Sequence, residues 1–444
     1  MIEFVLALPP QGNLQEMITV IDAVMGSGKT THIIKHINET YQQDLKANFD
    51  RGQRPTKFLV VTPLLSEVER FRSSCPMLDF RDPQPIEGRK LHHLETLVRE
   101  GRNIVSTHAL FRLLNRDIFR LLQDENYVLI LDEVLDCVQI FKTLTKADKD
   151  LLFDQRLVYV DPETKRLGWN MRDHSAYSGR FSAIKELCRN GNLVCRNGTV
   201  LLWEFPVEFL ECFSDIIILT YMFHGSPMSA HLKAAGLMCS LRAIQDGTLV
   251  NYTEVDESAL KAHLSGLIEV YDGPMNEIGN RQGRSNALSS SWFKRQSPET
   301  LKRIGSSTRR FFEVTAGSPS NANMWTCFKD QKQSLKGPGY TRGWVPLSTK
   351  ATNDYANKQS LAYLCNLFPH PVIKGSFTDR GISFDDDLYA LSEMIQWIWR
   401  SQIRNFQPIS LFIPSQRMRG LLTDWLASKN TLELIKREPQ LIAA

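Results

Sequence analysis

The residues best suited to chemistry lie at positions 18–31, ITVIDAVMGSGKTT, where a short apolar run leads into a glycine-rich turn. Gly26 and Gly28 have no Cβ, so backbone N–H groups can converge on phosphate oxygens, and a following helix would direct its positive end at them. Lys29 would then reach the β- and γ-phosphates, and the Thr30 hydroxyl would complete a Mg²⁺ shell. The spacing predicts an ATP- and Mg²⁺-binding loop made of Met25, Gly26, Ser27, Gly28, Lys29, Thr30 and Thr31.

A second group of chemical residues follows the apolar run in 127–136, YVLILDEVLD. An Asp at the end of a buried strand can hold Mg²⁺ through water, and an adjacent Glu can orient and deprotonate an attacking water. We therefore predict that Asp132 joins Thr30 at the metal and that Glu133 is the general base of an ATP hydrolase.

The elements that must position these groups alternate between strand and helix. Apolar runs predict strands at 19–22, 57–63, 103–106, 127–131 and 215–219, and helices are expected after the first three of them. The carboxyl ends of parallel strands open onto one crevice, so the residues that follow strands 57–63 and 103–106 are expected to face it. This order predicts an α/β first domain over residues 1–250.

The alternation of predicted strands and helices is interrupted between about residues 146 and 214. Residues 156–169 and 192–203 each read as two strands joined by a turn, and Asn197-Gly198 is a strong hairpin signal. We predict a small hairpin-rich insertion in the first domain. It could split a duplex as a pin, brace the two domains, or dock a replication protein.

A second domain is expected over 251–444, with linker signals at Asp246-Gly247 and at 272–274. Strands are predicted at 342–353, 360–367 and 408–414, and a helix at 387–404. On that helix Gln396, Arg400 and Arg404 would share one face, because they are four residues apart. Two arginines and an amide on one face suit a phosphate.

Composition and charge narrow the class of protein. The 444 residues are 42% hydrophobic, and no apolar run approaches the roughly 20 residues of a membrane helix. Residues 281–350 hold 13 basic and 3 acidic residues, interleaved with eight large aromatics. Cations beside aromatics are typical of a groove for single-stranded nucleic acid, although an ordinary aromatic core beneath a charged surface has the same composition. The aromatics are Trp292, Phe293, Phe311, Phe312, Trp325, Phe328, Tyr340 and Trp344.

Taken together, the motifs resemble those of superfamily two helicases, in particular the small helicase-like ATPases of tailed bacteriophages. AVMGSGKTT resembles motif I, VVTPLLSEVERF motif Ia, VSTHALF motif Ic, LILDEVLD motif II, LTYMFHGS motif III, PLSTKATNDY motif V and QWIWRSQIR motif VI. The segment Asp379-Arg380-Gly381-Ile382 is a rival for motif V, and Trp399 stands where motif VI commonly has Gly.

The resemblance implies two RecA-like parallel-sheet P-loop domains in tandem, with ATP in the cleft between them. It implies that Arg400 or Arg404 is an arginine finger and that Gln396 orients the water. It also implies contacts to nucleic acid from Thr62, Pro63, Thr107, His108, Thr352 and Asn353.

The expected function is an ATP-dependent helicase or translocase that acts on nucleic acid, with single-stranded DNA favoured over RNA, in replication, recombination or repair. Three alternatives stay open: a terminase-like packaging motor, a nucleotide kinase, and an ATP-gated clamp that binds DNA without unwinding it. The expected location is the cytoplasm, that of the host for a phage-encoded protein. Eight scattered cysteines without paired spacing argue against a zinc site or a disulfide framework.

Overall fold

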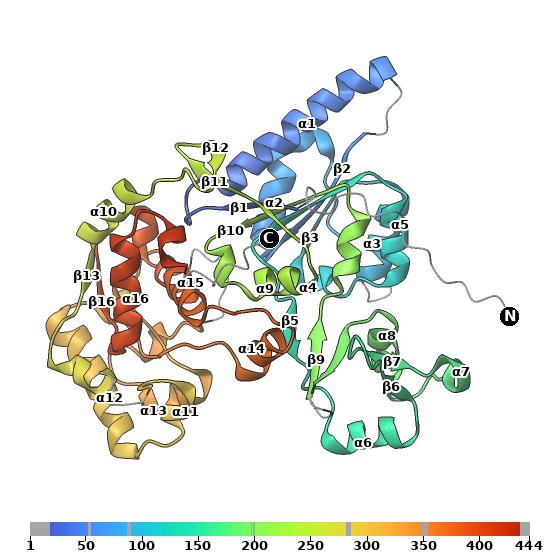
Figure 1. Ribbon diagram of the computed structural model, residues 1–444. Coiled ribbons are helices and arrows are strands. Elements are labelled where there is room, and N and C mark those ends of the chain that lie inside the picture. Colours follow the sequence, from blue (N-terminus) through green and yellow to red (C-terminus); the bar gives the residue numbers. More distant parts are fainter. Residues whose placement is uncertain are drawn as a thin grey trace, which may run out of the picture.

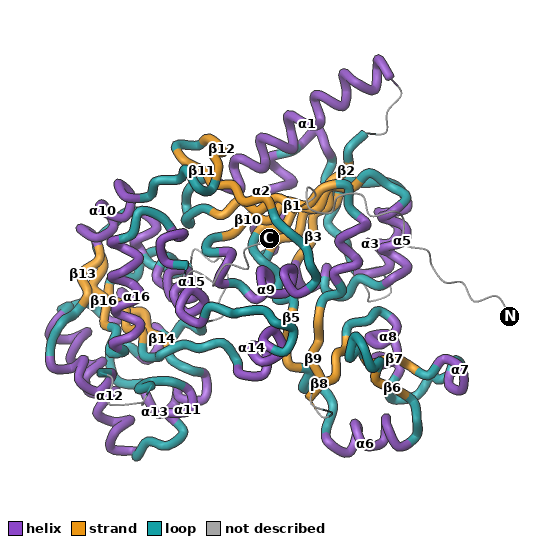
Figure 2. The backbone as a smooth tube through the Cα atoms, in the orientation of Figure 1, coloured by secondary structure: helices purple, strands orange, loops and turns teal. Residues whose placement is uncertain are grey.

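The computed structural model contains two parallel sheets that lie side by side (Figures 1 and 2). It describes residues 18–51, 55–86, 90–196, 198, 200–280, 286–347 and 354–435. The predicted α/β class, with two parallel sheets in tandem and inserted hairpins, is confirmed. In the described residues no helix is long and apolar enough to cross a membrane.

The first sheet has the order β12-β11-β1-β10-β4-β2-β3 and is parallel except for β12. The strand β10 lies between β1 and β4, with Asp22 opposite Thr220 and Leu219 opposite Asp132. This register brings the ends of β1 and β4 to the same edge. The strands are β1 (Ile18–Asp22), β2 (Lys57–Thr62), β3 (Ile104–Thr107), β4 (Tyr127–Asp132), β10 (Asp215–Thr220), β11 (Ser240–Gln245) and β12 (Thr248–Asn251).

Helices cover both faces of this sheet because its central strands are apolar on both sides. Two separate groups of buried side chains fill these faces, one beneath α1 and α2 and the other beneath α3 and α5. The helices are α1 (Lys29–Arg51), α2 (Leu65–Ser74), α3 (Lys90–Arg99), α4 (His108–Phe111), α5 (Arg116–Gln123) and α9 (Pro227–Ala234).

The insertion contains the two predicted antiparallel hairpins, β6–β7 and β8–β9, together with three helices that the sequence pattern missed. Its strand β9 also pairs with β5, which directly follows the first-domain segment around Leu135. The elements are β5 (Val138–Ile140), α6 (Lys146–Asp154), β6 (Val158–Val160), β7 (Leu167–Trp169), α7 (Met171–His174), α8 (Ser182–Arg189), β8 (Leu193–Arg196) and β9 (Val200–Glu204).

The insertion contacts the second domain through ion pairs. Both terminal nitrogens of Arg380 donate to the Glu204 carboxylate, at 3.2 and 3.3 Å, and Arg196 lies 4.0 Å from Asp379. Trp203 is buried, with the Arg112 guanidinium 4.3 Å from its ring centroid. These contacts favour the brace over the pin, because a wedge would need an exposed aromatic. Asn197 and Thr199 lie outside the described residues.

The second sheet, β13-β16-β15-β14, is parallel throughout. Its elements are α10 (Ser258–Leu267), β13 (Ile268–Val270), α11 (Ser290–Phe293), α12 (Pro298–Arg310), β14 (Asn323–Thr326), α13 (Lys332–Leu335), β15 (Ser360–Tyr363), α14 (Pro371–Thr378), α15 (Asp386–Ile398), β16 (Ile409–Phe412) and α16 (Gln416–Ala427).

Three local predictions were wrong. The described part of 342–353 forms no strand and makes a single bridge, Trp325 to Trp344. The expected linker at Asp246-Gly247 is the tight turn of the β11–β12 hairpin, where both residues have positive φ. The predicted helix 387–404 ends at Ile398. It ends there because the Ser401 hydroxyl donates to the Ile398 carbonyl oxygen, and Ser401 itself is extended.

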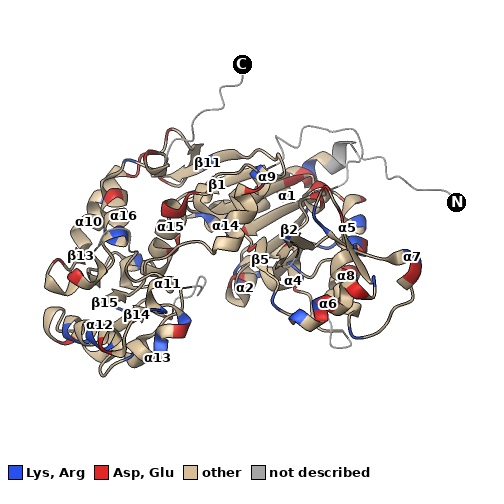
Figure 3. Cartoon of the chain, turned by 60° about the horizontal axis from the view of Figure 1, so that its bottom comes forward, with Lys and Arg blue, Asp and Glu red and all other residues tan. Residues whose placement is uncertain are grey.

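The aromatic block of 281–350 is mostly core. Basic residues occur along α12 and α13 (Figure 3), but five of the eight aromatics belong to a buried cluster in this part of the chain. Composition alone could not distinguish a groove that stacks on bases from a hydrophobic core. The burial of these rings shows that most of them belong to the core. The buried rings are Phe293, Phe311, Phe312, Trp325 and Tyr340, and Trp292, Phe328 and Trp344 are partly buried.

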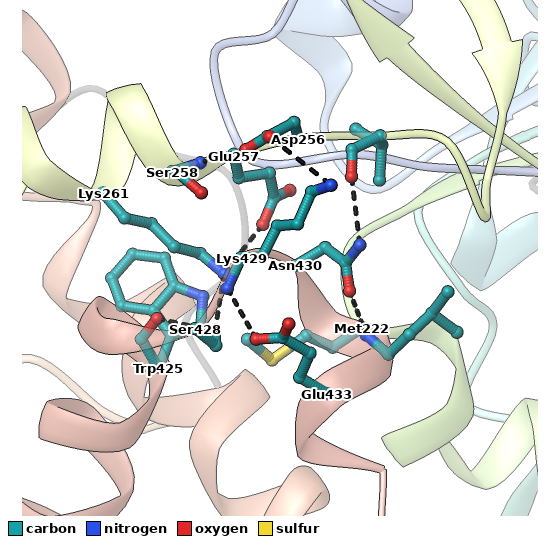
Figure 4. Close-up of polar contacts among 12 residues, drawn as sticks. Met222, Asp256, Glu257, Ser258, Lys261, Trp425, Ser428, Lys429, Asn430 and Glu433 are labelled. Atoms are coloured by element: carbon teal, nitrogen blue, oxygen red, sulfur yellow. Dashed lines mark hydrogen bonds and ion pairs between the residues drawn. The ribbon is translucent and has the colours of Figure 1, made fainter.

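The two domains share a buried polar contact. Lys261 of α10 is only 1% exposed, lies 3.0 Å from Glu257, and donates to Ser428 Oγ at 2.9 Å (Figure 4). Glu257 also accepts from the hydroxyl of Tyr221, which follows β10 and itself accepts from Trp425 Nε1 at 2.7 Å. The end of the first sheet is therefore hydrogen-bonded to a helix of the second domain.

Candidate nucleotide-binding cleft

A cleft of about 410 Å³ lies where the two domains meet, at the carboxyl edge of the first sheet. It brings together residues from the glycine-rich loop, the end of β4, helix α2 and the segment that follows α15. The residues that line it are Met25, Gly26, Gly28, Lys29, Thr30, Thr31, Pro63, Glu67, Arg70, Asp132, Glu133, Val134, Leu219, Thr220, Tyr221, Gln396, Trp399, Arg400 and Arg404.

The loop has the backbone that phosphate binding requires. Gly26 and Gly28 have backbone φ angles of 82° and 89°, which residues with a side chain rarely adopt. Helix α1 begins directly after them, at Lys29. The Lys29 ammonium donates to the carbonyl oxygens of Ala23 and Val24. Burial lowers the pKa of Lys29 to about 8, against the opposing effect of Asp22 and Asp132. Ser27, the remaining loop residue, is half-buried on the turn, and its hydroxyl oxygen is buried.

The predicted metal residues meet. The hydroxyl of Thr30 donates to Asp132 Oδ1 at 3.3 Å, because β10 places the end of β4 beside the start of α1. Burial, followed by the neighbouring carboxylates of Glu133 and Glu67, raises the pKa of Asp132 to about 7, against the opposing effect of Lys29. A divalent cation would relieve this repulsion. The chemistry of the pair therefore fits Mg²⁺, which prefers oxygen ligands.

Glu133 is held in an unusual backbone conformation. Its φ of 85° lies in the left-handed region, and its N–H donates to the Leu219 carbonyl oxygen at 3.0 Å. A non-glycine residue there costs on the order of 1–3 kcal/mol and persists where the surroundings enforce it. The hydrogen bond to β10 holds the backbone of Glu133 in this conformation, and the residue lines the cleft.

The second domain contributes Gln396, Arg400 and Arg404, but not from one helix as predicted. Gln396 lies on α15 and donates to Ser392, Arg400 follows the helix, and Arg404 lies in the short 3₁₀ helix Gln402–Asn405. Arg400 is 7% exposed, and its Nε and Nη1 have no hydrogen-bond partner among the described residues. Burial lowers its pKa, and the carboxylates of Glu393 and Glu133 oppose that effect.

Sequence reasoning missed several residues of this region, of which four bear on its chemistry. Glu67 and Arg70 line the cleft from helix α2, whose polar sequence suggests a solvent-exposed helix. Trp399 lies 3.8 Å from the position that a Cβ on Gly26 would occupy. Asp22 is fully buried and accepts from the backbone N–H groups of Met222 and Phe223, both at 2.8 Å, and from the Tyr252 hydroxyl at 3.1 Å. The sequence feature that could have identified Asp22 is a charged residue at the end of an apolar strand.

The structure does not bring the expected nucleic-acid residues together as one exposed surface. Thr62 is buried and donates to the Leu64 carbonyl oxygen, whereas Pro63 lines the cleft between the domains. Thr107 is half-buried opposite Thr62, and His108 is buried at the start of α4. Thr352 and Asn353 lie outside the described residues. These assignments stay predictions.

Comparison with solved structures finds weak likenesses. S. tokodaii Xpd4 has a TM-score of 0.44 and 10% identity, over 94% of this chain and 96% of that chain. Mss116p (NTE and C-tail double deletion), bound to ssRNA and AMP-PNP, has a TM-score of 0.31 and 12% identity, over 94% of this chain and 70% of that one.

Sequence comparison is more informative. The model of the YonV middle domain matches residues 138–203, and that of the YonV C-terminal Rossmann-like domain matches 262–426. The chain is 36% identical over 427 residues to the SPbeta prophage-derived uncharacterized protein YonV of Bacillus subtilis (strain 168), covering 93% of this chain and 100% of that protein. The chain belongs to the YonV family.

Proposed function

We propose that this protein is an ATP hydrolase that acts as a nucleic-acid-dependent helicase or translocase, with DNA as the preferred polymer. The observation that carries the proposal is the position of Arg400. A buried guanidinium, two of whose nitrogens have no hydrogen-bond partner in the described part of the chain, lines the same cleft as Lys29 and Glu133, although it comes from the other domain. Buried donors without acceptors are rare, and an anion such as a terminal phosphate would supply the missing acceptors.

The residues present would divide the work of hydrolysis. The backbone N–H groups around Gly26 and Gly28 would hold phosphate oxygens, and the Lys29 ammonium would leave its loop carbonyls to bind them. Glu133 would take a proton from the attacking water, which Gln396 would orient. Arg400 would stabilise the charge that develops on the transferred phosphoryl group.

Thr30 and Asp132 would hold Mg²⁺, which, when bound, neutralises phosphate charge. The fit rests on their hydroxyl–carboxylate contact at 3.3 Å and on the raised pKa of Asp132, since both features favour an added cation. Because Lys29 lines the same cleft, its ammonium and the metal ion would both neutralise phosphate charge.

The domain arrangement supports a motor rather than a kinase. A site that both domains complete allows nucleotide binding and release to change the distance between them, and such a change is what a translocase needs. A nucleotide kinase would not need Arg400, which comes from the other domain. The packaging motor and the ATP-gated clamp share this arrangement, so they remain the second candidates.

Steady-state phosphate release with and without single-stranded DNA or RNA tests the proposal. We expect turnover to rise at least fivefold with one polymer and to be absent in Lys29→Ala. Strand separation on a forked duplex then distinguishes a helicase from a clamp. Turnover unaffected by every polynucleotide would contradict the helicase, translocase and clamp functions together.

A further inference from the structure

Helix α2 places a carboxylate and a guanidinium in the cleft that the proposed chemistry does not yet use. Glu67 Oε2 lies 3.3 Å from Arg70 Nη1, and Arg70 Nη2 donates to the Thr31 hydroxyl at 3.3 Å. Thr31 is the neighbour of the metal residue Thr30. Glu67 is therefore fixed, through Arg70, to the start of α1.

Glu67 faces the second domain as well. It lines the cleft together with Arg404, and it is the carboxylate whose charge raises the pKa of Arg404 against the lowering effect of burial. Arg404 lies on the 3₁₀ helix beyond the end of α15, so its position moves with the second domain. Glu67 and Arg70 belong to the first domain.

The two cleft arginines have different surroundings. Arg400 is 7% exposed and has buried nitrogens without an acceptor in the described part of the chain, so it is suited to a ligand. Arg404 is half-buried and already has a carboxylate of the protein near it. One arginine is therefore suited to the phosphate and the other to the opposite wall of the cleft.

We propose that Glu67 and Arg404 form a charge pair across the cleft that closes the two domains around a bound nucleotide, leaving Arg400 alone to act on the reacting phosphate. Glu67 and Arg404 are then positioning residues, and Arg70 holds the Glu67 carboxylate in place. The inference rests on the proposed ATPase function and assigns which of the two arginines is the finger.

A double-mutant cycle tests the pair. The variants are Glu67→Gln, Arg404→Gln, the two combined, and the charge exchange of Glu67→Arg with Arg404→Glu. Each single change is expected to raise KM for ATP about fivefold to tenfold with kcat within twofold, since a charge pair formed on closure would couple the two residues by about that amount. The combined variant should be no worse than either single one, and the exchange should recover most of the wild-type KM.

A matched control is Glu69→Gln on the same helix. Glu69 is exposed and pairs with Arg72 instead of lining the cleft, so this variant should match the wild type. Arg400→Gln should behave differently from the pair and lose kcat at nearly constant KM. Additive effects of Glu67→Gln and Arg404→Gln, or loss of kcat in Arg404→Gln with Glu67→Gln silent, would overturn the proposal.

The pair can be judged even if the proposed function fails. If the wild type binds ATP without turnover, the same cycle is measured on the Kd of a fluorescent ATP analogue. If no nucleotide binds, the ATPase proposal fails, and the cycle is then measured on thermal unfolding of the nucleotide-free protein. Additive shifts in Tm would overturn the charge pair, whereas a nonadditive cycle with recovery by the exchange would support it.

Discussion

The hydroxyl of Thr30 lies 3.3 Å from Asp132 Oδ1, although 102 residues separate them. The contact depends on β10, which enters the sheet between β1 and β4 about eighty residues later in the chain. A metal site made in this way needs the whole first sheet. Mg²⁺ binding at this proposed site should therefore depend both on the folding of the first sheet and on the side chains of Thr30 and Asp132.

Glu133→Gln should abolish turnover while ATP still binds. The amide keeps the shape of the side chain but cannot take a proton from water, and loss of a general base lowers rates about 10²–10⁴-fold. Phosphate release and binding of a fluorescent ATP analogue check this prediction. Lys29→Ala serves as the reference that should lose both properties, and wild-type turnover by Glu133→Gln would remove Glu133 from the role of base.

Thr30→Ala should raise the Mg²⁺ concentration needed for half-maximal turnover about tenfold. The hydroxyl belongs to one of the two residues that we propose as metal ligands, and Thr30→Ser, which keeps it, should restore the wild-type dependence. Magnesium titrations of the ATPase rate measure the effect. Equal Mg²⁺ dependence in all three proteins would place the metal elsewhere.

Arg400→Met should separate activity from stability. Removal of the finger is expected to lower kcat about 10³-fold or more. At the same time, the variant removes two buried nitrogens that have no acceptor among the described residues, so the free energy of unfolding should rise by about 1 kcal/mol. Urea unfolding without nucleotide measures the second effect, and a variant that is both less active and much less stable would show that Arg400 is structural.

Trp203→Ala should destabilise the protein by about 3–5 kcal/mol, as expected for a buried aromatic in a close-packed site. A pin would instead lose strand separation at unchanged stability. Urea unfolding and forked-duplex assays on the same variant distinguish the two. Tyr159→Ala, in the same insertion but 55% exposed, is the matched control and should change stability little.

Asp22 should give the stability of the protein a distinctive pH dependence. Burial raises its pKa from 3.8 to about 6, so the folded state holds this proton more tightly than the unfolded chain. Between pH 4 and 6 the free energy of unfolding should therefore fall as pH rises, by about 3 kcal/mol for the full shift.

The Asp22→Asn variant lacks this titration, so its stability deficit relative to wild type should be larger at pH 4.5 than at pH 7. Urea unfolding at the two pH values measures the difference. Tyr252→Phe removes a hydrogen bond that lowers the pKa of Asp22 but keeps the carboxyl group, so it should retain the titration and move it to higher pH. A deficit that grows with pH would mean that Asp22 is stabilised as the anion.

The sequence alone was sufficient for the parts of the cleft that are local. The turn around Gly26 and Gly28 needs positive φ, Lys29 begins a helix, and the apolar run before Asp132 and Glu133 is a buried strand, all of which follow from neighbouring residues. The parallel sheets could also be predicted, because strand and helix signals alternate.

Only the tertiary structure decided which distant side chains share that cleft and which are core. Glu67 and Arg70 look like solvent-exposed helix residues, and only the packing of α2 beside the loop brings them to Thr31. Arg400 and Arg404 reach the cleft although their helix ends at Ile398, so the predicted shared helix face is wrong. Five of the eight aromatics of 281–350 are buried because they belong to the core cluster that packs on the second sheet. Periodicity reports which residues are apolar, but it does not report which surface covers them, and that is set by long-range packing.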